Sequence, residues 1–183
     1  MIDDIRINEA IKKFTLNLNL KFEDQKRGGE SKSLKSIAGD SPAFLIHFWN
    51  PWVNQSMAAM RVFLKLCATL IENKIPVASI LLGSTSADRR AGDDFRAQKK
   101  HENTGHWLVD TEKLSLGSLM RLSSFPTVFL VSDKGKILFN GDPANRRLWE
   151  TLTAIKPEII FPTIDVVLSK KDEKSASAPK NSE

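Results

Sequence analysis

The residues best placed to do chemistry lie in one short loop, Trp52-Val53-Asn54-Gln55-Ser56, between an apolar stretch and a long helical pattern. A tryptophan followed by two cysteines three positions apart is the spacing of a thiol–disulfide exchange loop, in which a thiolate attacks a disulfide. Val53 and Ser56 occupy the two cysteine positions here. A valine methyl group is no nucleophile and a serine hydroxyl stays protonated near neutral pH, so the loop lacks the groups that this chemistry needs.

Two elements must hold this loop in place. The nearly continuous apolar run from Ala43 to Trp49 predicts a central strand that helices cover on both faces. After Asn54, apolar residues recur at steps of three and four and stop near Asn73, which predicts a helix whose N-terminus points at the loop. His47 is the one polar residue that interrupts the strand.

Three motifs follow one another in an order that resembles a protein superfamily. Phe48-Trp49-Asn50-Pro51-Trp52-Val53-Asn54-Gln55-Ser56 comes first, Ser124-Phe125-Pro126-Thr127 second, and Asp133-Lys134-Gly135-Lys136-Ile137 third, with Gly141 behind it. Together they resemble the thioredoxin superfamily, in its TlpA-like branch, over about residues 14 to 155. The resemblance implies an α/β, thioredoxin-like three-layer fold with a central mixed β-sheet flanked by helices.

The resemblance also implies a binding groove. In similar proteins the proline that matches Pro126 is cis and faces the redox loop, and the residue before it pairs its backbone with an extended peptide. A tertiary amide makes such a cis bond accessible. The implied binding residues are Trp52, Asn54, Gln55, Ser124, Phe125 and Pro126. The alternative interpretation is that Trp49, Trp52 and Pro126 only maintain the fold.

His47 has two interpretations. The resemblance places it beneath the loop, where thioredoxins carry a buried acid. It is either a buried neutral imidazole bonded to backbone or water, or the partner of Ser56 in a Ser-His pair for hydrolysis or group transfer. Such a reaction also needs an orienting acid and an oxyanion hole, and the sequence identifies neither. No residue is therefore assigned as catalytic.

Cys67 is the single cysteine, so no intramolecular disulfide can form. Its neighbours follow helical periodicity, which predicts a small buried hydrophobic side chain. The alternative is retained thiol chemistry through Cys67, in a TlpA-like oxidoreductase, a one-cysteine peroxidase or a disulfide-linked dimer. No neighbouring histidine, arginine or helix N-terminus is visible that would lower its pKa.

Composition narrows the remaining functions. With 183 residues, 41% hydrophobic and 27% charged, the chain is typical of one soluble globular domain. The net charge of +5 is dispersed and not interleaved with aromatic residues, which speaks against nucleic-acid binding. His47, His101 and His106 form no i, i+4 pair, and no phosphate loop or nucleotide motif is present, so we expect no metal and no cofactor.

The expected domain organisation has four parts: an N-terminal extension over 1–13, a thioredoxin-like domain over 14–157, an apolar extension over 158–168 and a disordered tail over 169–183. No apolar run approaches the roughly 18 residues that would cross a membrane. The acidic start lacks the pattern of a secretory signal, which indicates a cytoplasmic protein if the chain is complete. If a signal or anchor was removed, the cell envelope or periplasm is expected instead.

The remaining elements are predicted from periodicity and turn residues. The predicted strands are Phe14–Leu20, Val77–Leu82, Trp107–Asp110, Thr127–Val131 and Lys136–Phe139. A turn is expected over Ser33–Ile37, and helical segments over Asp88–His101, through Leu114, Leu119 and Leu122, and over Ala144–Ile155.

The function that these features favour is a redox-inactive, thioredoxin-fold protein. It would bind a protein or peptide through the former active-site groove, as an adaptor or a chaperone-like factor. Two alternatives stay open: an enzyme working through Cys67 or through Ser56 and His47, and a structural domain that oligomerises through its C-terminal apolar extension. The sequence sets neither the partner nor the oligomeric state.

Overall fold

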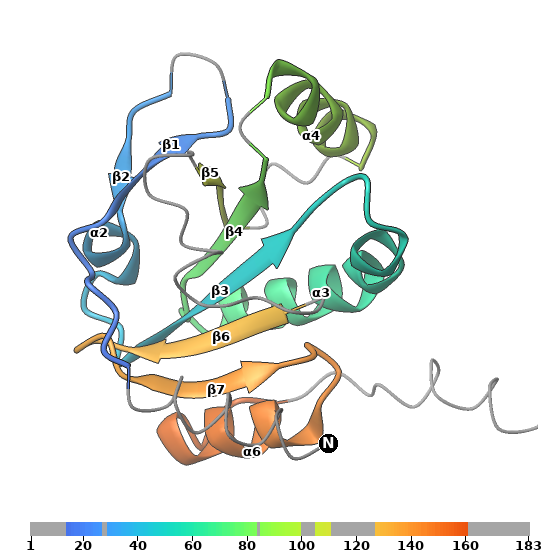
Figure 1. Cartoon of the computed structure of the whole chain (residues 1–183). Coiled ribbons are helices and arrows are strands. Elements are labelled where there is room, and N and C mark those ends of the chain that lie inside the picture. Colours follow the sequence, from blue (N-terminus) through green and yellow to red (C-terminus); the bar gives the residue numbers. More distant parts are fainter. Residues whose placement is uncertain (1–13, 27–28, 84, 100–104, 111–126, 161–183) are drawn as a thin grey trace, which may run out of the picture.

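The computed structural model describes residues 14–26, 29–83, 85–99, 105–110 and 127–160. Within them, one mixed seven-stranded sheet has the order β2-β1-β5-β4-β3-β6-β7 (Figure 1). The strands are β1 Lys21–Asp24, β2 Lys32–Ser33, β3 Ala43–Trp49, β4 Val77–Leu82, β5 His106–Asp110, β6 Thr127–Ser132 and β7 Ile137–Gly141. The helices are α2 Leu34–Ala38, α3 Asn54–Glu72, α4 Ser86–Lys99 and α6 Arg146–Ile155.

Strand β3 lies at the centre of the fold, and all seven of its residues are buried. It pairs in parallel with β4 and antiparallel with β6. Because successive side chains alternate between the faces of a strand, Leu45 and Trp49 join the core under α3 and α6, whereas Phe44 and Phe48 join the core under α2. The expected three-layer α/β architecture with helices on both faces is confirmed.

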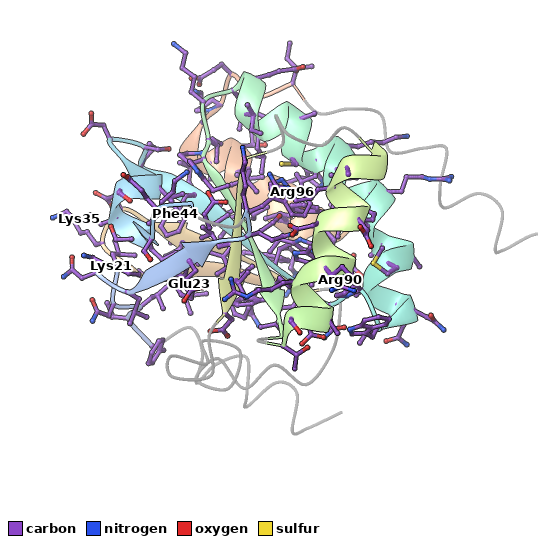
Figure 2. The ribbon with its side chains drawn as sticks, turned by 90° about the horizontal axis from the view of Figure 1, so that it is seen from above. Lys21, Glu23, Lys35, Phe44, Arg90 and Arg96 are labelled. Carbon is purple, nitrogen blue, oxygen red and sulfur yellow. The ribbon has the colours of Figure 1, made fainter. Side chains whose placement is uncertain are left out.

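Helix α4 packs on the same face of the sheet as α3, through polar and aromatic contacts. Arg89 forms a salt bridge with Glu23 of β1, and the Arg96 guanidinium carbon lies 5.6 Å from the centre of the Trp107 ring (Figure 2). Gly92 allows the helix to come this near, because a Cβ atom there would lie 2.7 Å from Nε2 of Gln25. These contacts fix α4 beside β1 and β5.

Most of the predicted elements are confirmed within two residues of their ends. β3, α3, β4, β6, β7 and α6 lie where periodicity placed them, α4 begins at Ser86 rather than Asp88, and β5 begins at His106 rather than Trp107. The helical segment expected through Leu114, Leu119 and Leu122 lies outside the described residues.

The predicted strand over Phe14–Leu20 is wrong. Only Thr15 forms an isolated bridge, to Lys136, and β1 begins at Lys21. The Asn17 side chain accepts a hydrogen bond from the Asn19 N–H at 3.0 Å, which turns the chain locally. The carbonyls of Leu18 and Leu20 then accept the N–H groups that open α2 instead of pairing with a strand.

The segment Ser33–Ile37 forms a short helix rather than the expected turn. The Ser33 hydroxyl oxygen accepts a hydrogen bond from the Ser36 N–H at 3.0 Å, which caps α2.

At the other end of the described chain, Ile159 is buried in the core beside α6 whereas Ile160 is 84% exposed. Among the described residues, no helix combines the length and the apolar character that spanning a membrane requires.

The C-terminus of α3 ends in a left-handed residue. Lys74 has φ 60°, its N–H donates to the Ile71 carbonyl at 2.9 Å, and the Ile75 N–H donates to the Leu70 carbonyl at 2.8 Å. This pair of hydrogen bonds is a Schellman motif, and glycine is the residue that adopts its left-handed position at least cost. Leu70 and Ile75 are both buried in the core, which holds the motif closed.

We expect Lys74→Gly to stabilise the protein by roughly 0.5–1 kcal/mol, because glycine relieves the left-handed strain at Lys74. Urea unfolding followed by circular dichroism measures the change in the free energy of unfolding. Lys74→Ala removes the same side chain but keeps the strain, so it serves as the control. Equal midpoints for both variants would contradict the prediction.

Candidate functional site

One asparagine organises the loop between β3 and α3. The Asn50 backbone N–H donates to the Ser56 Oγ at 3.0 Å, and the Asn50 Nδ2 donates to the Leu82 carbonyl at 2.8 Å. The Asn50 Oδ1 accepts a hydrogen bond from the Trp52 N–H at 2.8 Å. Asn50 therefore ties the ends of β3 and β4 to the loop and to the first turn of α3. Sequence reasoning missed this role, although an asparagine before a proline is a turn signal.

The two former redox positions differ in burial. Ser56 is fully buried and its hydroxyl oxygen is the acceptor for Asn50, so it serves the loop as a structural acceptor. Val53 is half-buried and stands at the N-cap of α3, where its side chain makes no capping hydrogen bond. The first N–H groups of a helix have no intrahelical acceptor. The side chains of Asn54 and Gln55, in the first turn of α3, are exposed.

Trp52 is exposed but held in one orientation. Its side chain is 64% exposed, and its indole Nε1 donates to the Asp88 Oδ1 at 2.7 Å. The Asp88 Oδ2 in turn accepts the Thr85 hydroxyl at 2.6 Å and the Thr85 N–H at 3.1 Å. The hydrogen bonds from Thr85 and then Trp52 lower the pKa of Asp88, so this carboxylate is ionised at neutral pH. Thr85 and Asp88 are further contributors that the sequence did not reveal.

His47 is a neutral, buried imidazole. Its ring stacks on Phe63 of α3 with centroids 3.7 Å apart and planes 16° apart. Burial lowers the pKa of His47 to about 3. Neither ring nitrogen has a hydrogen-bond partner in the described part of the chain, so the expected bond to backbone is absent there. Ser79, the register neighbour of His47 on β4, also has a buried hydroxyl without a partner among those residues.

The structure does not bring His47 and Ser56 together as a catalytic pair. The His47 nitrogens form no hydrogen bond within the described residues, and the Ser56 hydroxyl oxygen accepts its bond from Asn50. A serine can act as a nucleophile only when a base takes its proton. This arrangement supplies no such base.

Cys67 lies inside the core rather than at the loop. The side chain is completely buried among apolar residues of α3 and the sheet, as predicted for a small hydrophobic residue. Burial raises the pKa of the Cys67 thiol to about 12. The thiolate, which is the reactive form, is therefore scarce at neutral pH.

The remaining groove residues, Ser124, Phe125 and Pro126, lie outside the described residues. The next residue, Thr127, opens β6 and pairs with Phe48, which is one residue from the end of β3. The first residue of β6 thus stands at the same edge of the sheet as the loop. This is the edge at which the resemblance places the groove.

The described residues give no support to a metal site, because they contain no group of three His, Cys, Asp or Glu side chains that could hold an ion. His101 lies outside these residues. His106 opens β5, one residue before the predicted strand, and its Nδ1 lies 3.3 Å from the Lys32 Nζ. The register of β5 against β4 places it in the sheet.

Two hollows open at the other end of the sheet, away from the loop. One measures about 410 Å³ and the other about 290 Å³, and both are lined by Lys74 and Ile75. Val77 and Ala43, which begin β4 and β3, lie in their walls. Neither hollow belongs to the site around Trp52.

Comparison with known proteins identifies the fold. No model of a protein family matches the chain, and no curated protein matches it by sequence. Solved structures do match. A thiol-disulfide oxidoreductase from Bacteroides fragilis is 23% identical with a TM-score of 0.56, over 72% of this chain and 95% of that one. StoA from Bacillus subtilis is 20% identical with a TM-score of 0.55, over 73% of this chain and 97% of that one.

A third structure, a hypothetical protein from Sinorhizobium meliloti, is 16% identical with a TM-score of 0.61, over 78% of this chain and 85% of that one. At such identities the likeness concerns the fold. The chain has a thioredoxin-like α/β fold, which it shares with the thiol-disulfide oxidoreductases that match it. The resemblance in the sequence is confirmed at this level.

We expect acid to destabilise the protein through His47. Its pKa of about 3 in the fold lies below the ordinary 6.5, so the unfolded chain binds the proton first. The contribution of His47 to the free energy of unfolding is fully present above pH 6.5 and is lost as the pH drops toward 3. Between pH 7 and pH 4.5, His47 alone should lower the free energy of unfolding by on the order of 2 kcal/mol.

The measurement is urea unfolding at a series of pH values for the wild type and for His47→Leu, which keeps an apolar contact with Phe63. The variant should lose this part of the pH dependence, so the two profiles converge at low pH or cross. Stability profiles of the two proteins that run parallel from pH 7 to pH 4.5 would show that His47 is not the cause of this pH dependence.

Proposed function

We propose that this thioredoxin-fold protein binds another protein or an extended peptide through the face formed by the loop 50–56, without thiol–disulfide chemistry. Adaptor or chaperone-like action is the role that such a face would serve. The main support for the proposal is that the loop has no cysteine and yet has a defined conformation. Its redox positions hold Val53 and Ser56, yet its fold is maintained by the hydrogen bonds of Asn50.

The binding capacity of this face rests on two features. The N-cap of α3, Val53, makes no side-chain hydrogen bond to the first N–H groups of the helix, which suit a carbonyl oxygen of a partner. Trp52 offers a large exposed ring whose position is already fixed by Asn50 and Asp88. Preorganised aromatic side chains lose little entropy on binding and often dominate the affinity of an interface.

Thiol chemistry through Cys67 has less support. The thiol is buried, and the pKa of Cys67 is raised to about 12, which is the opposite of what a peroxidatic or exchanging cysteine requires. The oligomerisation alternative depends on the segment 158–168, of which only 158–160 lie among the described residues. A binding role for the loop face therefore remains the best-supported function.

We expect the wild-type protein not to accelerate insulin reduction by dithiothreitol, because no accessible thiol exists among its described residues. Val53→Cys/Ser56→Cys should create an active pair, since the first position is accessible and the second is buried in the first turn of α3. Turbidity of reduced insulin measures the rate. Wild-type acceleration that disappears in Cys67→Ser would contradict the redox-inactive proposal.

We expect Trp52→Ala to weaken partner binding by tenfold or more, as removal of a central aromatic anchor typically does. Affinity capture from the native host, followed by titration of the captured partner, measures the change. Phe14→Ala is the matched control, because Phe14 is another exposed aromatic residue, at 40%. Equal loss in both variants, or no loss in Trp52→Ala, argues against the loop face.

A further inference from the structure

Trp52 and Asp88 form an aromatic surface next to a negative charge. The indole N–H donates to the Asp88 carboxylate at 2.7 Å, and the ring is 64% exposed. A carboxylate that accepts this hydrogen bond polarises the indole and adds electron density to its face. Tryptophan already offers the best ring surface for a cation among the aromatic side chains. The Trp52 ring and the Asp88 carboxylate therefore both attract an approaching cation.

The charge of Asp88 is not cancelled within the described residues. Its oxygens accept hydrogen bonds from Trp52 and Thr85, both neutral, and it forms no salt bridge there. Arg89, its neighbour on α4, is paired with Glu23 instead. Within the part of the chain that the structure describes, the carboxylate is therefore a negative charge without an ion-pair partner.

Apart from Arg89, the positive side chains nearest in sequence to the loop and to Asp88 are Arg61 and Arg90. Residues 50–60 contain no charged side chain. Arg61 follows Asn54 by seven positions, about 10 Å along α3, where salt screens much of its charge. Arg90, labelled in Figure 2, follows Asp88 by two positions on α4, and no salt bridge joins the two side chains.

We propose that the Trp52–Asp88 surface binds a cationic side chain, arginine or lysine, of an extended peptide whose backbone carbonyl occupies the N-terminus of α3. This inference rests on the proposed function and specifies the class of partner. The cation packs on the exposed face of Trp52 and is attracted by Asp88. A neutral carbonyl suits the N–H groups of α3, so one peptide satisfies both parts of the face.

The test uses three synthetic peptides of the form acetyl-Ser-Gly-X-Gly-Ser-Gly-X-Gly-Ser-amide, in which X is arginine, leucine or glutamate. They are titrated into the full chain while the Trp52 indole N–H signal is followed by NMR, after assignment with Trp52→Phe. We expect the arginine peptide to shift this signal and to bind about 2- to 5-fold more tightly than the leucine peptide, and the glutamate peptide to bind most weakly.

Asp88→Asn is the decisive variant, because an asparagine oxygen can still accept the indole hydrogen bond but carries no charge. It should remove the preference for arginine over leucine. Asp94→Asn, an exposed carboxylate on the same helix, is the matched control and should keep the preference. Raised salt should weaken only the arginine peptide's advantage.

Equal or tighter binding of the leucine or glutamate peptide overturns this inference, as does the absence of any shift with the arginine peptide. Retention of the arginine preference in Asp88→Asn overturns it as well. These results leave the proposed function intact. Partner capture that is unchanged by Trp52→Ala contradicts the proposed function itself, so the two failures are distinguishable.

Discussion

The burial of β3 on both faces is the constraint on which the rest of the structure depends. Seven consecutive residues without solvent contact require apolar partners above and below, and the chain supplies them with α3 and α6 on one side and α2 on the other. Apart from His47, the residues of this enclosed strand are apolar until it leaves the sheet. Asn50, the first half-exposed residue after β3, directs the loop.

The site is thus a consequence of how a buried strand ends. The hydrogen bonds of Asn50 join the ends of two strands to the loop and, through the Ser56 hydroxyl, to the start of α3. The Ser56 hydroxyl, at a position that the resemblance matches to a redox cysteine, completes this network. The shape of the loop thus depends on hydrogen bonds that need no thiol.

Sequence patterns predicted the parts of the fold that burial determines. The apolar run of β3 and the helical periodicity of α3 report directly on which faces are covered, and the solved structures that match confirm the fold class. Prediction failed where local hydrogen bonds decide, as at Asn17, which interrupts a well-alternating strand. The hydrogen bond between Trp52 and Asp88 joins residues 36 positions apart, and a pattern of local sequence spacing cannot predict such a contact.

The burial of Cys67 bears on the redox conditions under which this protein keeps the same structure. A chain whose single cysteine is enclosed in the core has the same covalent structure in a reducing compartment as in an oxidising one. Its relatives in fold, by contrast, include enzymes named for exchanging disulfides. The binding face proposed at the loop would be insensitive to the redox potential around it, so a partner would meet the same face in either compartment.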